Sequence, residues 1–597
     1  MSSSQTLPEP GPGPEPGPEP EPVPHGQTPE PEPDHHGYTS EPESDSALDL
    51  LALEFESSQP DRLIKVCHPL RQRQESKPSV MIGLDLGTSA LKALALDASG
   101  QVVARARMAY PTHRPAAGAA EQNPADWWAA LTGCCDQLTR QVAAESWGGI
   151  GLSAMMPTLV TLDAAYRPLG PAITWQDTRA SSCAAQLVER FGAAWLYETT
   201  GQRLDGRYLL PMARQARRGE DTVAGAKDYL LYRLTGHLAT DPSTATGYGA
   251  FDLRSGHWDG QILDGAKVPP VVPGVTSYAL SDAAAAALGC PAGLPVTVGA
   301  ADSVMAAHGL GLTTGQIIYV AGTSTVILGL AADRRLDPDR RYLVTPLAGA
   351  GFGLEMDLVA TGSALAWLAR LLRPDGSGAT AGLRGDRPGK LDDAAATASA
   401  SPQRFAFEPG GLEVNACQCQ GDTVRWALEL AEQSDPDSAP IFLPHVAPGE
   451  QGALWNSQLT GLVSGLTLAT GAGDLVRGLI TGIVVESRRC LAVLADQLGD
   501  PTGEVITTGS GAGSALLRQE LADASGRPVR HVAGEGDHSA IGAAKLAWQA
   551  AGHDAQLGGS LAASQSGLTL PDPARADWWS AAARAADQLR QRVFQPD

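Results

Sequence analysis

The sequence predicts an α/β fold made of two related domains that face each other across a cleft, preceded by a disordered N-terminal tail. From residue 81 onward, short apolar runs of strand length alternate with segments of helical periodicity, which is the pattern of α/β domains. The same pattern, two apolar runs joined by a Gly-Thr-Ser turn, occurs at 84–96 and again at 316–330. Such a repeated hairpin indicates two related domains. Residues 1–46 consist largely of Pro, Glu and Gly, which cannot bury a core, so this tail is predicted to be disordered and extended.

The first hairpin reads MIGLDLGTSALKALALD over 81–97, two apolar runs joined by the turn Gly87-Thr88-Ser89. The backbone N–H groups and hydroxyls of such a turn suit an anion, and Asp85, at the end of the first run, can hold a cation nearby. Taken alone, the stretch fits an ordinary hairpin equally well. The second hairpin carries the same turn at Gly322-Thr323-Ser324, so the pair predicts two phosphate-binding turns that hold one nucleotide tail from both sides.

Composition limits the partners of this chain. At 597 residues it exceeds what one hydrophobic core supports, so several domains are expected. The net charge of −22 argues against nucleic acid and against an anionic membrane surface, although ten of the acidic side chains lie in residues 1–46. The eight cysteines show neither zinc nor thioredoxin spacing, which predicts reduced thiols and a cytoplasmic location. We expect no signal peptide, no transmembrane helix and a small-molecule substrate, and a homodimer is compatible with the sequence.

The remaining segments alternate as this fold requires. Buried strands are predicted at 149–153, 159–163, 441–444 and 505–508. Helices are predicted from about 181, at 47–56, 226–236, 361–371, 471–494 and 539–548, and as far as 522 after the strand at 505–508. Residues 241–245 read as a turn, and part of 373–438 as an insertion or an irregular surface segment. Small residues in the last helix, Gly542, Ala543 and Ala544, predict close packing.

A glycine-rich turn, 509–514, joins the strand at 505–508 to the helix that follows. A strand, a Gly-rich turn and a helix in this order form a place where backbone closely approaches a nucleotide. The spacing matches neither GxGxxG nor a P-loop, so neither a dinucleotide-binding fold nor a P-loop enzyme is predicted.

Six segments in this order resemble the FGGY family of carbohydrate kinases, within the superfamily of actin, sugar kinases and Hsp70. They are DLGTSALK (85–92), AEQNPADWW (120–128), TWQDTRA (174–180), GAADSVMAAHGLG (299–311), AGTSTVILG (321–329) and TTGSGAGSALLRQELAD (507–523). The resemblance implies two RNase-H-like domains that flank a nucleotide cleft. It divides the chain into a tail and linker (1–79), an N-terminal domain for sugar and phosphate (81–315), a C-terminal nucleotide domain (316–555) and a C-terminal helical extension (556–597).

The resemblance also implies transfer of the ATP γ-phosphoryl group to a sugar hydroxyl. Asp302 matches the catalytic base, because a carboxylate can accept the proton that the hydroxyl loses as phosphorus is attacked. Asp85 matches the position that organises Mg²⁺. The residues implied for ATP and its phosphates are Thr88, Ser89, Gly322, Thr323, Ser324, Gly509, Ser510, Gly511, Ala512 and Gln519. Those implied for the substrate are Met156, Trp175, Gln176, Asp177, Arg179 and Asp302.

These roles have structural alternatives. Asp302 stands at the start of an expected helix and can be an N-cap, and the glycines can serve turn geometry alone. Asp177 and Arg179 can form a structural ion pair. His308 and His445 have no partners at metal-ligand spacing, so both are read as structural.

The sequence alone leaves open which substrate is phosphorylated and whether the protein is an enzyme. Segments at 152–156, 173–179 and 453–456 are most similar to gluconokinases, so gluconate is expected first, and xylulose or another pentulose or polyol is the alternative. Departures from the family pattern at Pro157, Gln451 and Thr481 bear on substrate identity. A rival of another class is a nucleotide-binding protein without transferase activity, either a degenerate sugar-kinase-like sensor or an actin-like ATPase. The position of Asp302 and the Trp-x-Asp-x-Arg stretch argue against the actin-like version.

Overall fold

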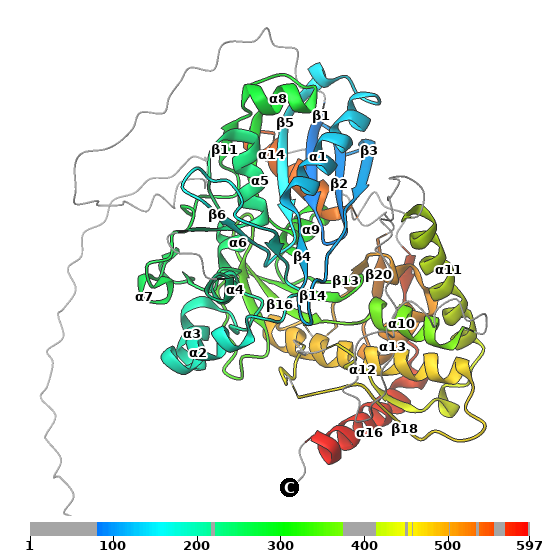
Figure 1. Cartoon of the computed structure of the whole chain (residues 1–597). Coiled ribbons are helices and arrows are strands. Elements are labelled where there is room, and N and C mark those ends of the chain that lie inside the picture. The colour runs from blue at the N-terminus through cyan, green and yellow to red at the C-terminus, as the bar shows by residue number, and fades with distance from the viewer. Residues whose placement is uncertain are drawn as a thin grey trace, which may run out of the picture. The chain divides into compact units, whose positions relative to one another are not determined.

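The computed structural model describes residues 80–216, 221–373, 413–447, 452–456, 458–500, 502–532, 537–553 and 567–594 (Figure 1). The tail and linker predicted for 1–79, the helix at 47–56 and the departure at Gln451 lie outside these residues. Across the described part of the chain, no helix combines the length and the apolar content needed to cross a bilayer.

The first sheet has six strands in the order β11-β12-β5-β1-β2-β3. The central strand β1 is antiparallel to β2, which is antiparallel to β3, whereas β5 runs parallel to β1 and β12 runs parallel to β5. Because β1, β5 and β12 are parallel, their carboxyl ends meet at one edge of the sheet, where ligands of α/β folds bind. The strands are β1 (Val80–Leu86), β2 (Ala90–Asp97), β3 (Val102–Ala109), β5 (Trp147–Ala154), β11 (Ser277–Ala279) and β12 (Pro295–Ala301).

The second sheet repeats this arrangement. Its order is β15-β16-β14-β13-β19-β20-β21, with β13 antiparallel to β14, β14 antiparallel to β16, and β19 and β20 parallel to β13. The predicted internal repeat is therefore confirmed, because both hairpins begin a sheet of the same topology. The strands are β13 (Ile317–Ala321), β14 (Thr325–Ala331), β15 (Leu343–Pro346), β16 (Phe352–Leu358), β19 (Val505–Thr508), β20 (Val529–His531) and β21 (Gly567–Thr569).

Helices cover both faces of the first sheet. Side chains of β1 alternate between the faces: Ile82 packs with α1, α5 and α8, whereas Met81 packs with α14. On the second sheet, α12 and α13 cover one face, and α9 packs against the other through Ala307 and Leu310. The helices are α1 (Pro124–Thr139), α5 (Ala226–Thr235), α8 (Asp282–Leu288), α9 (Asp302–Leu310), α12 (Ala472–Leu498), α13 (Ala515–Ser525) and α14 (His538–Ala550).

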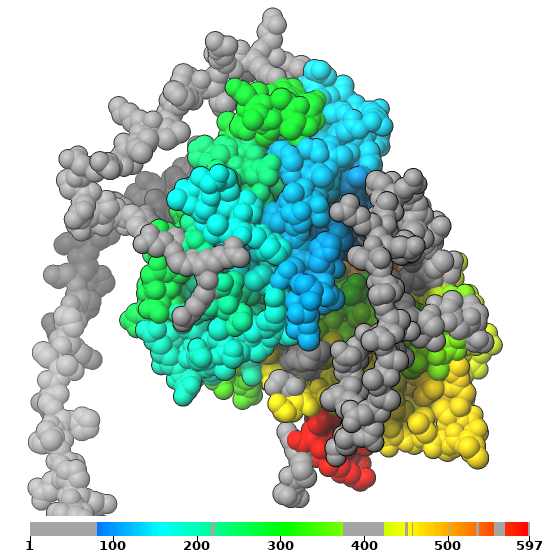
Figure 2. All heavy atoms as spheres, in the orientation of Figure 1, coloured from blue at the N-terminus to red at the C-terminus, as the bar shows by residue number. Residues whose placement is uncertain are grey.

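The structure also contains smaller elements. Figure 2 shows atoms from both halves of the chain on one face of the molecule. A four-stranded sheet has the order β4-β7-β6-β8. Its strands are β4 (Glu121–Gln122), β6 (Leu159–Leu162), β7 (Ala172–Ile173) and β8 (Thr222–Gly225). Near it lie α2 (Ser181–Phe191), α3 (Ala193–Thr200) and α4 (Leu209–Ala216), and the second half adds α10 (Gly362–Leu372), β17 (Ile441–Leu443), β18 (Leu462–Ser464) and α16 (Ala576–Phe594).

Helix α14, drawn in orange behind β1 and β5 in Figure 1, confirms the close packing predicted for its small residues. A Cβ atom on Gly83 would lie 1.9 Å from the carbonyl oxygen of Ala540, and one on Gly151 would lie 1.8 Å from that of Ala543. No side chain fits at either position, so the helix backbone rests directly on the sheet. The second half of the chain thereby contributes a helix to the core of the first sheet.

One prediction of local structure is wrong. Residues expected as a turn at 241–245 begin a short helix, α6 (Pro242–Thr246), because the Asp241 side chain accepts from the backbone N–H groups of Ser243 and Thr244 and caps it. The stretch 373–438, part of which is expected to be irregular, also contains α11 (Glu413–Glu432). Its packing contacts include Ala427 and Ala431, and such small residues make a weak apolar pattern in the sequence.

Candidate active site

A cavity of about 170 Å³ lies at the carboxyl ends of the first sheet and is also lined by residues of the second. Chain segments almost two hundred residues apart meet there, since Met156 and Glu355 both line it. Five residues predicted for the site are brought together in this cavity: Thr88, Met156, Trp175, Asp302 and Ser324.

Asp302 is the first residue of α9, directly after the end of β12. The N-cap position belongs to Ala301, so the capping alternative for Asp302 does not hold. One carboxylate oxygen accepts from the Ser303 N–H at 2.9 Å, and Ser539 Oγ donates to the Asp302 carbonyl at 3.0 Å. Burial raises the pKa of Asp302 to about 8, and the nearby Asp85 and Glu355 carboxylates add to this rise. The group is thus held as a proton acceptor of unusual basicity for a carboxylate.

Asp85 lies at the end of β1 and is buried, with Ser153 Oγ of β5 donating to its carboxylate at 3.0 Å. Burial raises its pKa, while the Lys92 ammonium opposes the rise. The described residues contain no group of three His, Cys, Asp or Glu side chains arranged to hold a metal ion. Mg²⁺ in kinase sites is held by one or two carboxylates together with phosphate oxygens and water, so Asp85 beside Asp302 fits this ion as a donor set.

The two hairpin turns are fixed by hydrogen bonds to their surroundings. Trp175 Nε1 donates to Thr88 Oγ1 at 3.1 Å, which joins the first turn to the segment after β7. In the second turn, the Gly322 N–H donates to the Ser324 carbonyl at 2.9 Å, and the Thr323 carbonyl accepts from the Ser363 N–H at 3.0 Å. Both turns are therefore rigid, but Ser89, Gly322 and Thr323 do not line the cavity that holds Asp302.

The glycine-rich turn follows β19, beside the end of β13. Gly509 has a φ of +93°, and a Cβ there would lie 2.3 Å from the Ala321 carbonyl oxygen, so only glycine fits. Gln519 Nε2 donates to Asp523 Oδ1 at 2.8 Å and to the Leu570 carbonyl at 3.1 Å, which commits that amide to protein partners. None of the predicted residues of this region lines the Asp302 cavity: Gly509, Ser510, Gly511, Ala512 and Gln519.

Asp177 and Arg179 form an ion pair away from Asp302. Arg179 Nη2 lies 2.7 Å from Asp177 Oδ2 and 2.7 Å from Glu121 Oε1, and the Ala120 N–H donates to Asp177 at 2.9 Å. Both residues line a separate cavity of about 230 Å³. Gln176 accepts from Arg114 Nη2 at 2.8 Å and does not line the Asp302 cavity either. The geometry favours the structural alternative for the Asp177–Arg179 pair.

Sequence reasoning missed the carboxylates of β16. Glu355 and Asp357 stand two residues apart on one face of this strand, and both line the cavity. Burial raises the pKa of Glu355 to about 8, with Asp357 adding to it, and burial raises the pKa of Asp357 to about 7 despite the opposing charge of Arg207. The signal was present as FGLEMDL, since two acidic residues at period two in an apolar strand mark a functional face. Three further lining residues from the segment between α3 and α4 were also missed: Gln202, Arg207 and Tyr208.

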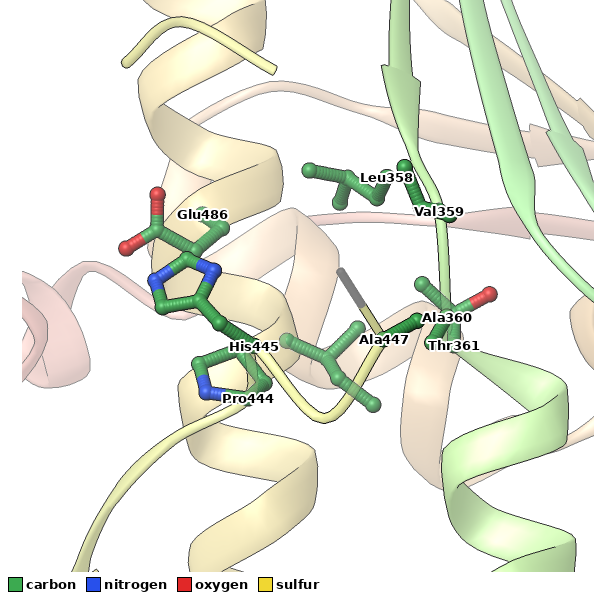
Figure 3. Close-up of a pocket in the computed structure, with 9 residues that line it drawn as sticks. Leu358, Val359, Ala360, Thr361, Pro444, His445, Ala447 and Glu486 are labelled. Atoms are coloured by element: carbon green, nitrogen blue, oxygen red, sulfur yellow. The ribbon is translucent and has the colours of Figure 1, made fainter. Parts of the chain in front are cut away.

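A smaller cavity of about 30 Å³ lies beyond the end of β16 (Figure 3). There the His445 ring lies beside the Glu486 carboxylate of α12. Burial lowers the pKa of His445, although the Glu486 charge opposes this, and its Nε2 atom is buried with no hydrogen-bond partner among the described residues. Val359 separates this cavity from that of Asp302, because it lines both. None of the residues predicted for the site lines it.

Two family models match the chain. The model described as the N-terminal domain of the FGGY family of carbohydrate kinases matches residues 80–309, and the model described as the C-terminal domain of the same family matches residues 317–551. Together they cover the first sheet, the second sheet apart from β21, and Asp302.

Similar proteins are kinases with different sugars in their names. A gluconokinase of Bacillus subtilis is 24% identical over 460 residues, 74% of this chain and 82% of its own length. A xylulose kinase of Escherichia coli is 27% identical over 492 residues, 80% of this chain and 91% of its own, and a glycerol kinase of Acidovorax is 26% identical over 501 residues, 79% and 90%. A solved gluconate kinase from Lactobacillus acidophilus shares the fold with a TM-score of 0.72 at 22% identity, over 87% of this chain and 98% of that one. The repeated sheets, the ordered segments around the cavity and the two matching models show that this chain belongs to the FGGY family of carbohydrate kinases.

Proposed function

We propose that this carbohydrate kinase transfers the γ-phosphoryl group of ATP to a hydroxyl group of a sugar or sugar acid bound in the Asp302 cavity. The observation that carries the proposal is Asp302 itself, a carboxylate of raised pKa at the start of a helix that packs between the two sheets. A general base works best when its pKa lies near the operating pH, and about 8 meets that condition.

In the proposed reaction, the oxygen of the substrate hydroxyl attacks the γ-phosphorus, the bond from that phosphorus to the β–γ bridging oxygen breaks, and ADP leaves. A carboxylate oxygen of Asp302 accepts the proton of the attacking hydroxyl. Asp85 would hold Mg²⁺, which neutralises charge on the phosphate oxygens when it is bound. The two hairpin turns contribute Thr88 and Ser324 to the lining of the cavity, and both are suited to fix the terminal phosphate.

The relatives leave the sugar open between gluconate, xylulose and glycerol. A coupled assay of ADP release, run with the full chain, ATP and Mg²⁺, tests the function across gluconate, xylulose, ribulose and glycerol. Stimulation of ADP release by at least one of them is expected. If no sugar stimulates release while ATP still binds, the non-catalytic sensor is the better interpretation.

We expect kcat/KM for the sugar to rise with pH and to level off above a midpoint of about 8. The base must be ionised to accept a proton, and burial together with Asp85 and Glu355 raises the pKa of Asp302 to that value. Rates at saturating ATP and Mg²⁺ from about pH 6 to pH 9.5 give the midpoint. In Glu355→Gln the midpoint should move to lower pH, since one neighbouring negative charge is removed. A flat profile in both proteins would contradict the role of Asp302.

The Asp85→Asn variant is expected to need about tenfold more Mg²⁺ for half-maximal rate, or more. The amide keeps the shape and the Ser153 contact but loses the charge that attracts the ion. A titration of rate against Mg²⁺ at fixed ATP measures this. Asp136→Asn, on the exposed side of α1, serves as the matched control and should titrate as the unmodified protein does. Equal Mg²⁺ requirements in Asp85→Asn and the control would remove Asp85 from the metal site.

A further inference from the structure

We propose that the Asp302 cavity selects an uncharged polyol or ketose over a sugar acid, with Glu355 and Asp357 as the residues that set this preference. The inference rests on the proposed function and names the substrate class of the same site. The inference follows from which hydrogen-bonding groups of the cavity already have partners in the protein and which do not.

Four of the hydrogen-bond donors that line the cavity are engaged with protein acceptors. Trp175 Nε1 donates to Thr88 Oγ1 at 3.1 Å, and Ser303 Oγ donates to Glu355 Oε2 at 2.7 Å. Tyr208 Oη donates to the Gln202 side-chain oxygen at 3.0 Å, and Gln202 Nε2 donates to the Val344 carbonyl at 2.8 Å. These four groups would have to break existing hydrogen bonds before they could bind a substrate carboxylate.

Among the described residues that line the cavity, Arg207 is the one with a guanidinium, and an aspartate already neutralises it. Its Nε atom donates to both carboxylate oxygens of Asp205, at 3.2 and 3.0 Å, and its Nη2 atom donates to Asp205 as well. This bidentate arrangement is the one by which an arginine recognises a carboxylate, and here a protein carboxylate occupies it. A sugar acid would therefore not find an arginine fork ready to receive it.

The acidic side chains of the cavity, in contrast, offer acceptors to a ligand. Asp302, Glu355 and Asp357 all line it, and Asp357 Oδ1 is buried with no hydrogen-bond partner among the described residues. A buried oxygen without a partner is costly unless a ligand supplies a donor. The hydroxyl groups of a neutral sugar donate hydrogen bonds to such oxygens, whereas a substrate carboxylate would add a further negative charge beside three acidic groups.

The raised pKa values of Glu355 and Asp357 agree with this picture. Burial already makes the charged form of each unfavourable. The Asp357 charge adds to the cost of ionising Glu355, and the Asp302 charge adds to that of Asp357. A bound anion would increase that cost further. A neutral polyol accepts hydrogen bonds from a protonated carboxyl and donates to an ionised one, so it is compatible with either state.

The test compares kcat/KM for xylulose, ribulose and glycerol with kcat/KM for gluconate, in the full chain with ATP and Mg²⁺. At least one neutral substrate should exceed gluconate by about tenfold or more. In Glu355→Gln and in Asp357→Asn, the ratio of gluconate to neutral substrate should rise by about tenfold, because each change replaces an acidic group of the cavity with a neutral amide. Glu145→Gln makes the same replacement at an exposed site before β5 and should leave the ratio unchanged.

A second readout separates this inference from the proposed function. The rise in thermal midpoint caused by each sugar without ATP reports binding alone, and it should be larger for a neutral sugar than for gluconate. If that order holds while no sugar is phosphorylated, the proposed function fails and the selectivity stands. Preference for gluconate in both readouts, or an unchanged ratio in two variants that keep the melting curve of the unmodified protein, would overturn the selectivity.

Discussion

The Asp302→Asn variant is expected to lose about a thousandfold in kcat, with little change in ATP binding. Asparagine keeps the size of the side chain and can still accept a hydrogen bond from the Ser303 N–H, so the start of α9 should remain in place. What it cannot do is accept the proton of the substrate hydroxyl. Steady-state ADP release measures the loss of transfer, and calorimetric titration with a non-hydrolysable ATP analogue measures the retained binding.

The control for this variant is Glu145→Gln, which changes the charge of an exposed side chain just before β5, whereas the cavity lies beyond the other end of that strand. It should keep the kcat of the unmodified protein. A second check is the pH profile: any residual transfer in Asp302→Asn should no longer depend on an ionisation with a midpoint of about 8. Full activity in Asp302→Asn would remove this residue from the catalytic role and reopen the site assignment.

The fold was largely predictable because it depends on local patterns that the sequence displays. The hairpins at 84–96 and 316–330 show alternating apolar runs around a fixed turn, and the structure places each at the centre of its sheet. The order of the strands around them follows from the parallel connections that α/β domains use. The close packing of α14 could be expected from Gly542 and its small neighbours, although its partner, the sheet of the other half, could not.

The site was harder to predict, because it depends on which segments meet in space. Asp302 and Trp175 could be predicted for the site because they stand in recognisable stretches, and both line the cavity, whereas Arg207 lies in an irregular segment with no pattern of its own. Asp177 and Arg179 are predicted as substrate ligands from the sequence, and in the structure they pair with each other while Arg179 also pairs with Glu121, so their role in substrate binding stays a prediction. A charged residue in a known stretch can serve the fold as readily as the chemistry, and only the geometry separates the two.

The largest effect on stability is expected when a buried charge network connected to the start of α9 is broken. Lys227 of α5 is buried, and its Nζ atom lies 3.1 Å from a carboxylate oxygen of Asp228 and 3.1 Å from one of Asp241. Burial alone would lower the pKa of Lys227, but these two carboxylates raise it above its usual value, so the lysine stays charged. The Asp241 carboxylate also accepts from Ser243, whose Oγ accepts from the Ala301 N–H at 2.9 Å, the residue before Asp302.

The Lys227→Met variant is expected to lower the free energy of unfolding by about 3–5 kcal/mol, the usual cost of breaking a buried ion pair from one side. Methionine fills a similar space but leaves two buried carboxylates without a cation. Because Asp241 also orients Ser243 and, through it, Ala301, the folded variant should show a lower kcat with a smaller change in KM. Urea denaturation followed by tryptophan fluorescence measures the first effect, and ADP release below the unfolding transition measures the second.

Two further proteins decide how this result is interpreted. Arg140→Met breaks an exposed ion pair with Asp136 on α1, and it should unfold at the same urea concentration as the unmodified protein. Combining Lys227→Met with Asp241→Asn removes one of the uncompensated charges and should recover part of the lost stability, because the cost lies in the stranded carboxylates rather than in the missing ammonium. If Lys227→Met is as stable as the unmodified protein, the network does not stabilise the fold. If the double variant is less stable than Lys227→Met alone, the hydrogen bonds that Asp241 makes to Ser243 matter more than its charge.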